Sequence, residues 1–216
     1  MIQASDITGL LVAIVLISLV PFIAMVVTSY AKIVVVLGLL RNALGVQQVP
    51  PNMVINGIAI LVSLYVMAPI GMSALRDFES KPPVGTSSER VIQIISSARP
   101  PFRAFLEKHA ATREKRFFLR SASVVWPREA AATLQENDLI VLAPAFALTQ
   151  LTEAFKIGFL LYIAFVVIDL VIANVLLAMG LNQVNPTNVA IPFKLLLFVV
   201  MDGWSTLIHG LIVSFR

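Results

Sequence analysis

Residues 7–31 read ITGLLVAIVLISLVPFIAMVVTSYA, a run of 25 residues without one charged side chain. An α-helix rises about 1.5 Å per residue, so a helix of this length crosses a hydrocarbon core of roughly 30 Å. The segment lacks the positively charged start of a secretory signal peptide. We therefore expect an uncleaved membrane helix, bent at Pro21, whose apolar character resumes after Lys32 and continues to Leu40.

The charges of the chain are unevenly placed. Of the 216 residues, 58% are apolar and only 13% are charged, whereas a soluble domain is about 25% charged. Three charged side chains lie in residues 1–75, 21 in residues 76–156 and four in residues 157–216. Two apolar blocks therefore flank one hydrophilic segment, which is typical of an integral membrane protein and excludes an ordinary soluble enzyme.

Further apolar runs of spanning length define the expected architecture. They cover Val54–Leu75, Ile157–Met179 and Val189–Ile212. We predict an all-α membrane protein with two long apolar helical hairpins on either side of a small hydrophilic helical subdomain. The predicted boundaries are 1–75 for the first hairpin, 76–156 for the subdomain and 157–216 for the second hairpin.

The hydrophilic segment contains several helix signals. Thr86 and Glu89 have the spacing of a capping box at the start of a short helix. The pair Pro100–Pro101 is expected to open a second, amphipathic helix, and Pro127 a third, short one. From Pro144 the chain is expected to be helical again and to lead into the second hairpin.

The two hairpin turns resemble each other in sequence. ALGVQQVPPNMV at 43–54 aligns with AMGLNQVNPTNV at 178–189, and six of the twelve positions are identical. Ordinary turn chemistry explains the glycines and prolines of this pattern but not its shared glutamine. An internal duplication and simple turn chemistry both stay open, and either way the two tips should have similar shape and face the same side. The turn residues are Gly45, Pro51, Gly180 and Pro186.

Basic residues give the expected orientation. Lys32, Arg41 and Lys194 lie nearer the hairpin turns than the ends of the chain. The positive-inside rule then places both turns on the cytoplasmic side and residues 76–156 on the opposite side of the membrane.

Two charges inside the apolar runs need an explanation, because an ionised side chain is costly in hydrocarbon. Asp169 lies about 13 residues before the centre of the second turn and Lys194 about 11 after it, so they reach similar depth on antiparallel helices. One interpretation is a structural ion pair, within a chain or between copies; the other is a proton or ion relay. The ion pair is favoured, because transport sites usually show more than one such pair. Asp202 is expected to face water or cap a helix.

Other chemistry finds little support in the sequence. The chain has no cysteine and no nucleotide-binding, serine-hydrolase or zinc-protease motif, so we expect neither an enzyme nor a cofactor or metal site. His109 and His209 stand alone, without metal-ligand spacing. The basic cluster Arg113–Arg116 is explained more simply as a solvated helix face than as a nucleic-acid site. Gly203 and Gly210 have heptad spacing, which favours close helix packing.

Several longer stretches carry a resemblance that covers nearly the whole chain. They are PAFALTQLTEAFKIGF at 144–159, VIDL at 167–170, MG at 179–180, IPFKLLLFV at 191–199 and DGW at 202–204, with GLLRNALG at 38–45 and PPN at 50–52 in the first hairpin. In these stretches the chain resembles the FliP/YscR/SctR family of type III secretion export-gate proteins. Its length and start are more similar to the injectisome branch, SctR, than to the flagellar branch.

The resemblance implies a function that composition does not reveal. Members of this family form a pentameric ring in the bacterial inner membrane and are joined by SctS-like and SctT-like subunits. With SctU-like and SctV-like components, this gate admits unfolded secreted proteins. The resemblance also implies that the hydrophilic segment faces the periplasm, and that sister subunits as well as membrane lipid cover the apolar helices. The distribution of charge leads us to expect no nucleic-acid partner.

The resemblance also implies site residues. Asp169 and Lys194 match buried charges of the family. The pore constriction of the family follows its Met-Gly, in a stretch that is rich in methionine there but not here. Gln150 stands where many relatives have glutamate, so an ion pair of that residue is absent here or replaced through Glu153. The constriction is expected at Leu181, Asn182, Gln183 and Val184. In the absence of methionine, either Leu181, Val184 and the amide side chains make the seal, or other subunits contribute more of it.

Overall fold

The computed structural model describes residues 18, 21–82 and 87–216, and every regular element in this part of the chain is a helix. The helices are α2 Tyr30–Leu44, α3 Asn52–Glu79, α4 Ser87–His109, α5 Thr112–Val125, α6 Arg128–Ala132, α7 Leu139–Ala178, α8 Pro186–Val200 and α9 Gly203–Val213. Within the described residues, α3 and α7 are long and apolar enough to cross a membrane, and two bent helix pairs add up to two further spans. The prediction of an all-α membrane protein is confirmed.

A sharp bend divides the first apolar run. Residues Pro21–Val27 are helical, and the chain then bends by 73° before α2 begins. Thr28 Oγ1 donates a hydrogen bond of 2.7 Å to a carbonyl one turn earlier, and Ser29 Oγ donates one of 3.0 Å to Ser63 Oγ of α3. The Thr28 bond gives a backbone carbonyl a side-chain donor next to the bend, and the Ser29 bond ties the bend to α3. The described bend thus lies at Thr28 and Ser29. The bend predicted at Pro21 would involve residues 19–20, which like residues 1–17 lie outside the described part.

The hydrophilic segment forms α4, α5 and α6. Pro100 and Pro101 do not start a new helix, because α4 runs through both of them to His109. Proline has a backbone φ that suits a helix, so it removes backbone hydrogen bonds without forcing the helix to end here, where α4 packs against α3 and α7. The capping box predicted at Thr86 lies outside the described residues. Pro127 precedes α6, as predicted.

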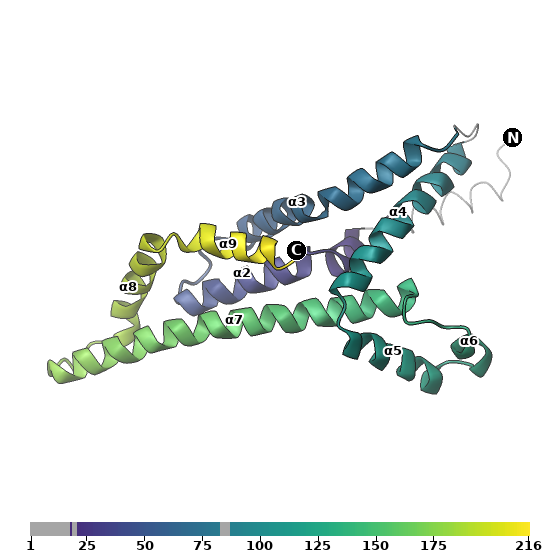
Figure 1. Cartoon of the computed structure of the whole chain (residues 1–216). Helices are drawn as coiled ribbons and strands as arrows, with labels where there is room; N and C mark the ends of the chain where they lie inside the picture. The colour runs from purple at the N-terminus through teal and green to yellow at the C-terminus, as the bar shows by residue number, and fades with distance from the viewer. Residues whose placement is uncertain (1–17, 19–20, 83–86) are drawn as a thin grey trace, which may run out of the picture.

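The helix α7 connects the hydrophilic segment to the second hairpin without a break. It has 40 residues and is thus about 60 Å long, twice the thickness of a hydrocarbon core. It begins at Leu139, after Asp138, and Pro144 lies inside its second turn instead of starting it. The predicted boundary between residues 156 and 157 falls within this helix. Figure 1 shows α7 running along most of the length of the molecule.

The last apolar run is two helices, not one. α8 and α9 meet at an angle of 63°. At the bend Asp202 has a φ of 51°, in the left-handed region that aspartate tolerates better than most residues. A Cβ on Gly203 would overlap the ring of Phe198, so a residue without a side chain is needed there. Asp202 is exposed and stands at the start of α9, where its carbonyl accepts a hydrogen bond of 3.1 Å from the Thr206 amide.

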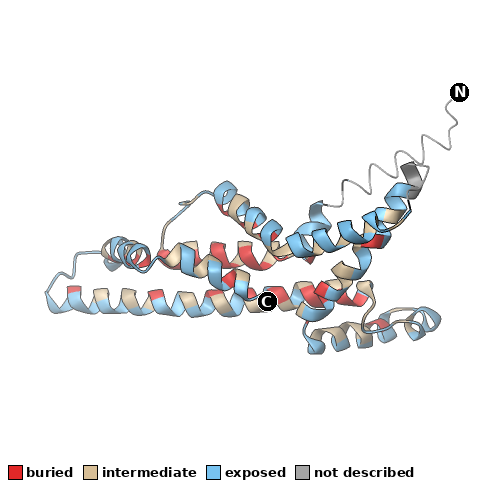
Figure 2. Ribbon diagram, turned by 45° about the horizontal axis from the view of Figure 1, so that its top comes forward, coloured by how far each residue is buried: buried red, intermediate tan, exposed pale blue. Residues whose placement is uncertain are grey.

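Buried side chains form a narrow core around α2 and the first half of α7. α2 contributes Ile33, Val36, Leu37 and Leu40, each fully buried. Figure 2 shows the buried residues of the chain in red and outer faces that are mostly pale blue. Only 17% of the most apolar window of α3 and 11% of that of α7 are buried within the chain. Most of the apolar surface of both helices is therefore left for lipid or other proteins to cover.

The closest helix contact in this core generates a first prediction. A Cβ on Gly158 of α7 would overlap the side chain of Leu39 of α2, with Leu39 Cβ only 2.9 Å away. We expect Gly158→Ala to lower the free energy of unfolding in detergent by about 1–3 kcal/mol, because overpacking forces the two helices apart.

The control for this prediction is Gly71→Ala, since nothing lies within 4 Å of the Cβ position there and alanine favours a helix over glycine. Combining Gly158→Ala with Leu39→Ala should recover part of the loss. A Gly158→Ala protein as stable as the Gly71→Ala protein would show that α2 and α7 do not pack this closely.

Candidate functional site

The two charges predicted inside the apolar runs lie in contact. Lys194 Nζ of α8 is 2.6 Å from Asp169 Oδ2 of α7. The side chain of Lys194 is only 6% exposed, whereas that of Asp169 is 40% exposed. A hydrogen bond between two charged groups at this distance is stronger than a neutral one, and it offsets part of the cost of burying the ammonium group.

The same lysine also reaches the first hairpin. Lys194 Nζ donates a second hydrogen bond, of 3.2 Å, to the backbone carbonyl of Ala43 near the end of α2. The carbonyl groups of a final helical turn have no partner in their own helix and carry partial negative charge, so a cation is well placed there. Lys194 thus joins α2, α7 and α8. Asp169 Oδ1 is buried without a hydrogen-bond partner among the described residues.

The two turns share the backbone features that their sequences suggested. Gly45 and Gly180 both adopt the left-handed conformation, with φ of 77° and 76°, in which glycine ends a helix without strain. Pro51 immediately precedes α3, and Pro186 is the first residue of α8. In Figure 1 both turns lie toward the same end of the molecule. Gln48 and Gln183 differ, because only Gln48 has a positive φ, of 63°.

Each turn is also held by a polar side chain that sequence reasoning missed. In the first turn Arg41 donates to Asn52 Oδ1 at 2.6 Å and to the Pro50 carbonyl at 3.3 Å. In the second turn Asn185 Oδ1 accepts a hydrogen bond of 3.0 Å from the Thr187 amide and caps α8. An Asn-Pro pair before an apolar run is a known signal for a helix start and could have identified this cap.

The predicted constriction residues form the tip of the second hairpin. Leu181, Asn182, Gln183 and Val184 are all exposed, between the end of α7 and the start of α8. The Leu181 amide donates to the Leu176 carbonyl at 3.0 Å, which closes the end of α7, and the Val184 amide donates to the Leu181 carbonyl at 3.1 Å. Two apolar residues are thus held on a tight turn, where they stay 42% and 37% exposed.

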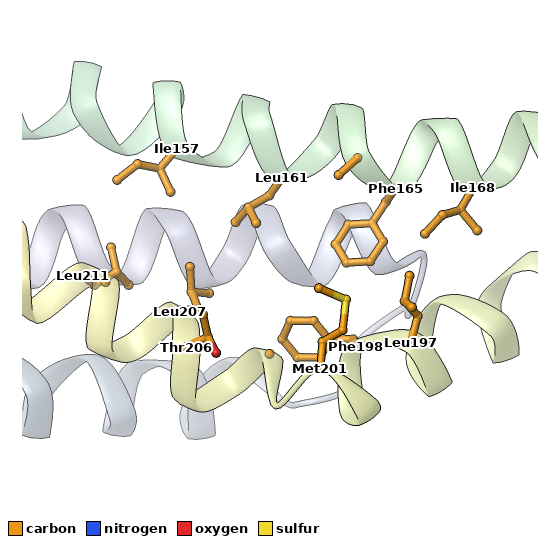
Figure 3. Close-up of a pocket in the computed structure, with 13 residues that line it drawn as sticks. Ile157, Leu161, Phe165, Ile168, Leu197, Phe198, Met201, Thr206, Leu207 and Leu211 are labelled. Carbon is orange, nitrogen blue, oxygen red and sulfur yellow. The ribbon is translucent and has the colours of Figure 1, made fainter.

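An apolar groove lies along α7, α8 and α9. It has a volume of about 680 Å³, and α9 contributes to it both Gly203 and Gly210, the pair predicted to allow close packing. Figure 3 shows Leu161 and Phe165 of α7 pointing toward Phe198 of α8 and the side chains of α9. A groove this apolar fits a hydrophobic helix or a lipid chain better than a polar ligand.

Metal chemistry receives no support from the described residues. No group of three or more histidine or acidic side chains is placed to hold a metal ion in this part of the chain. His209 is exposed on α9. The ring of His109 lies tilted against that of Phe105, with ring centres 4.8 Å apart, and edge-on to that of Phe215 at 5.5 Å. Burial, and then the nearby charges of Lys108 and Lys32, lower the pKa of His109, so it is neutral at pH 7.

The comparisons with known proteins identify the family. Residues 13–211 match the FliP family, which is more than nine-tenths of the chain. The chain belongs to the FliP family. It is 65% identical to a pathogenicity-related protein, ORF2, of Xanthomonas campestris pv. glycines, over 96% of each chain. It is 64% identical to the hypersensitivity response secretion protein HrcR of Ralstonia nicotianae, over 99% of this chain and 100% of that one. It is 46% identical to the Yop proteins translocation protein R of Yersinia pestis, over 100% and 99%.

The structure also shows what surrounds Gln150, where the resemblance led us to expect a glutamate in many FliP-family proteins. Gln150 is buried, its Nε2 donates to the His109 carbonyl at 3.0 Å, and its Oε1 has no partner among the described residues. Glu153, the residue expected to replace that ion pair, pairs with Lys156 of the same helix at 2.8 Å. The buried Lys32 instead lies 4.8 Å above the ring of Phe215. In this FliP-family chain the glutamine thus ties α7 to the end of α4 by a neutral hydrogen bond.

The ion pair yields a second prediction. Asp169→Asn leaves the buried Lys194 ammonium without a counter-charge and should lower the free energy of unfolding in detergent by about 2–3 kcal/mol. The double variant Asp169→Asn with Lys194→Met should be more stable than Asp169→Asn alone, since it removes the unpaired charge.

The matched control is Lys156→Met, which breaks an exposed ion pair and should change stability by less than about 0.5 kcal/mol. Lys194→Met is also measured alone. If the losses of unfolding free energy in Asp169→Asn and in Lys194→Met simply add up in the double variant, the two charges are not coupled.

Proposed function

We propose that this protein is a core subunit of a type III secretion export gate, in which it forms with sister subunits the pore that admits unfolded proteins. Membership in the FliP family supports this proposal, as do relatives whose names describe secretion and translocation. The observation that carries it is the uncovered apolar surface. Long apolar helices that bury so little within one chain need cover from neighbouring chains or from lipid.

The proposed pore uses the tip of the second hairpin. Copies arranged around an axis would bring Leu181 and Val184 of each chain together at a constriction, with the amide groups of Asn182 and Gln183 beside them. An apolar ring closes a pore by excluding water, and a turn outside a helix can yield to a passing polypeptide. Branched apolar side chains would thus do here what methionine does in the constriction of the family.

The proposed setting is the bacterial inner membrane. We propose a pentamer joined by SctS-like and SctT-like subunits, next to SctU-like and SctV-like components, with the hydrophilic helices α4 to α6 on the periplasmic side. The basic residues Arg41 and Lys194 near the two tips support a cytoplasmic side for the tips.

The alternative is an ion or small-solute transporter subunit that uses Asp169 and Lys194. The position of this charged pair inside apolar helices favours it, because ionisable groups inside apolar segments often mark ion pathways. The second hydrogen bond of Lys194, to the Ala43 carbonyl, supports a structural role instead, since it joins three helices.

The constriction gives a third prediction. The chain carrying Leu181→Gly and Val184→Gly, purified with its co-expressed gate subunits and placed in liposomes, should conduct small ions in the closed state, because the apolar ring is gone. Ion flux across the liposome membrane is the measurement. Val49→Gly, at an exposed valine of the first turn, is the control and should stay tight. Unchanged ion permeability in a fully assembled double variant would place the constriction elsewhere.

The ion pair separates the two functions in a fourth prediction. With Asp169→Asn and Lys194→Gln together, the gate should fail to assemble, because the joint between α2, α7 and α8 is weakened. The mass of the intact complex, purified with its neighbours, measures this. A complex of full mass whose ion or solute flux is abolished would instead support the transporter.

A further inference from the structure

A stripe of arginines runs along the outer face of α5. Arg113, Arg116 and Arg120 stand at spacings of three and four residues, which places them on one side of a helix. Phe117 and Val124 lie on the same stripe, 54% and 84% exposed. Together with Ser121 these five side chains line a hollow of about 550 Å³. The basic cluster that the sequence suggested as a solvated face is therefore interleaved with exposed apolar groups.

The opposite face of α5 is already occupied. Phe118 and Ala122 face inward, where they line a gap together with Ile140 and Val141 of α7. This packing fixes the rotation of α5 about its own axis, so the arginine stripe is held outward. Figures 1 and 2 both show α5 beside the first part of α7, at the end of the molecule away from the hairpin tips.

The arginines of the stripe are only weakly paired. Arg113 Nε lies 3.8 Å from Glu114 Oε1, and Arg116 Nε lies 3.7 Å from Glu136 Oε1 after α6. Both distances exceed that of a good charged hydrogen bond. Arg120 has no carboxylate within 4 Å among the described residues. Most of the N–H groups of the three arginine side chains are therefore free to donate to an anionic partner.

We propose that this arginine stripe is a docking surface for an acidic segment of a partner protein, with carboxylates on the guanidinium groups and an apolar side chain beside Phe117. Guanidinium forks match carboxylates in a bidentate way, and arginine with exposed aromatic groups is typical of the centres of protein interfaces. Charge complementarity thus selects an acidic partner, and Phe117 and Val124 select a protein over a free anion.

A membrane surface fits the stripe less well. A helix that lies in a lipid interface buries its own apolar face in the lipid, whereas the apolar face of α5 is packed on α7. α5 also runs along α7 instead of across it (Figure 1). If α7 crosses a bilayer, the stripe therefore stands upright to the membrane surface and does not lie flat on it. The docking surface is independent of the pore proposed above and goes beyond it.

The test uses the full chain in a non-ionic detergent. The probe is a fluorescein-labelled synthetic peptide with glutamate and leucine at helical spacing, and its matched peptide carries glutamine for glutamate. Fluorescence anisotropy should show saturable binding of the acidic peptide. The glutamine peptide should bind at least about tenfold more weakly. Added salt should weaken the binding of the acidic peptide. The triple variant Arg113→Gln, Arg116→Gln, Arg120→Gln should bind the acidic peptide at least about tenfold more weakly.

The matched control removes the same charge elsewhere in the hydrophilic segment, with Arg99→Gln, Lys108→Gln and Arg128→Gln, all exposed. Its affinity should stay within about twofold of the parent chain. Phe117→Ala, which keeps every charge, should weaken binding severalfold, and circular dichroism checks that each variant keeps its helices.

Four outcomes would overturn the proposal. They are no saturable binding of the acidic peptide to the parent chain, equal losses in the two triple variants, displacement of the peptide by millimolar inorganic phosphate, and arginine-dependent binding to phosphatidylglycerol vesicles in place of the peptide. None of these readouts needs an assembled pore, so failure here would leave the proposed function standing.

Discussion

The apolar surface of this chain exceeds what the chain itself can cover, and this constraint explains most of its structure. α7 has 40 residues, yet its buried side chains are concentrated where α2 and α4 meet its first half. Beyond Gly158 the buried side chains of α7 are sparse, chiefly Phe165 and Leu176. In water such a surface would cause aggregation, and in lipid it is stable. The three separate small cores follow from the same cause, since thin layers of helices cannot enclose a single large one.

Within this constraint, the junction around Lys194 sets the relative position of the two hairpins. Its ammonium group contacts Asp169 of α7 and the Ala43 carbonyl at the end of α2. One helical turn earlier in α8, the side chain of Ile191 lies 3.1 Å from the Cβ position of Gly45, so a larger residue in the first turn would push α8 away. α8 is therefore held across the end of α2, and the bend at Asp202 then returns α9 toward α2. The apolar groove between α7 and α9 results from this path.

The parts of the fold that depend on local chemistry could be predicted from the sequence. Runs without charge predicted the apolar helices, Gly45 and Gly180 predicted the turns, and equal rise along two antiparallel helices predicted that Asp169 and Lys194 would meet. The bend at Thr28 and Ser29 could not be predicted, because it involves a contact between distant segments, the Ser29–Ser63 hydrogen bond. Two prolines in sequence indicated a break in α4, but packing against α3 and α7 outweighs that local preference. The groove, the neutral environment of Gln150 and the orientation of the α5 stripe likewise require tertiary structure.

The length of α7 determines how the hydrophilic segment is attached to the second hairpin. A helix of about 60 Å exceeds a hydrocarbon core by roughly 30 Å, so it cannot lie entirely in lipid unless it is steeply tilted. Its first half carries the contacts with α4 and α5 and contains Glu153 and Lys156, whereas its second half carries only Asp169, which is paired. The charge distribution therefore assigns the second half to the apolar environment and the first half to the polar side. Because α7 is continuous, no loop separates the hydrophilic helices from the hairpin tip at Leu181.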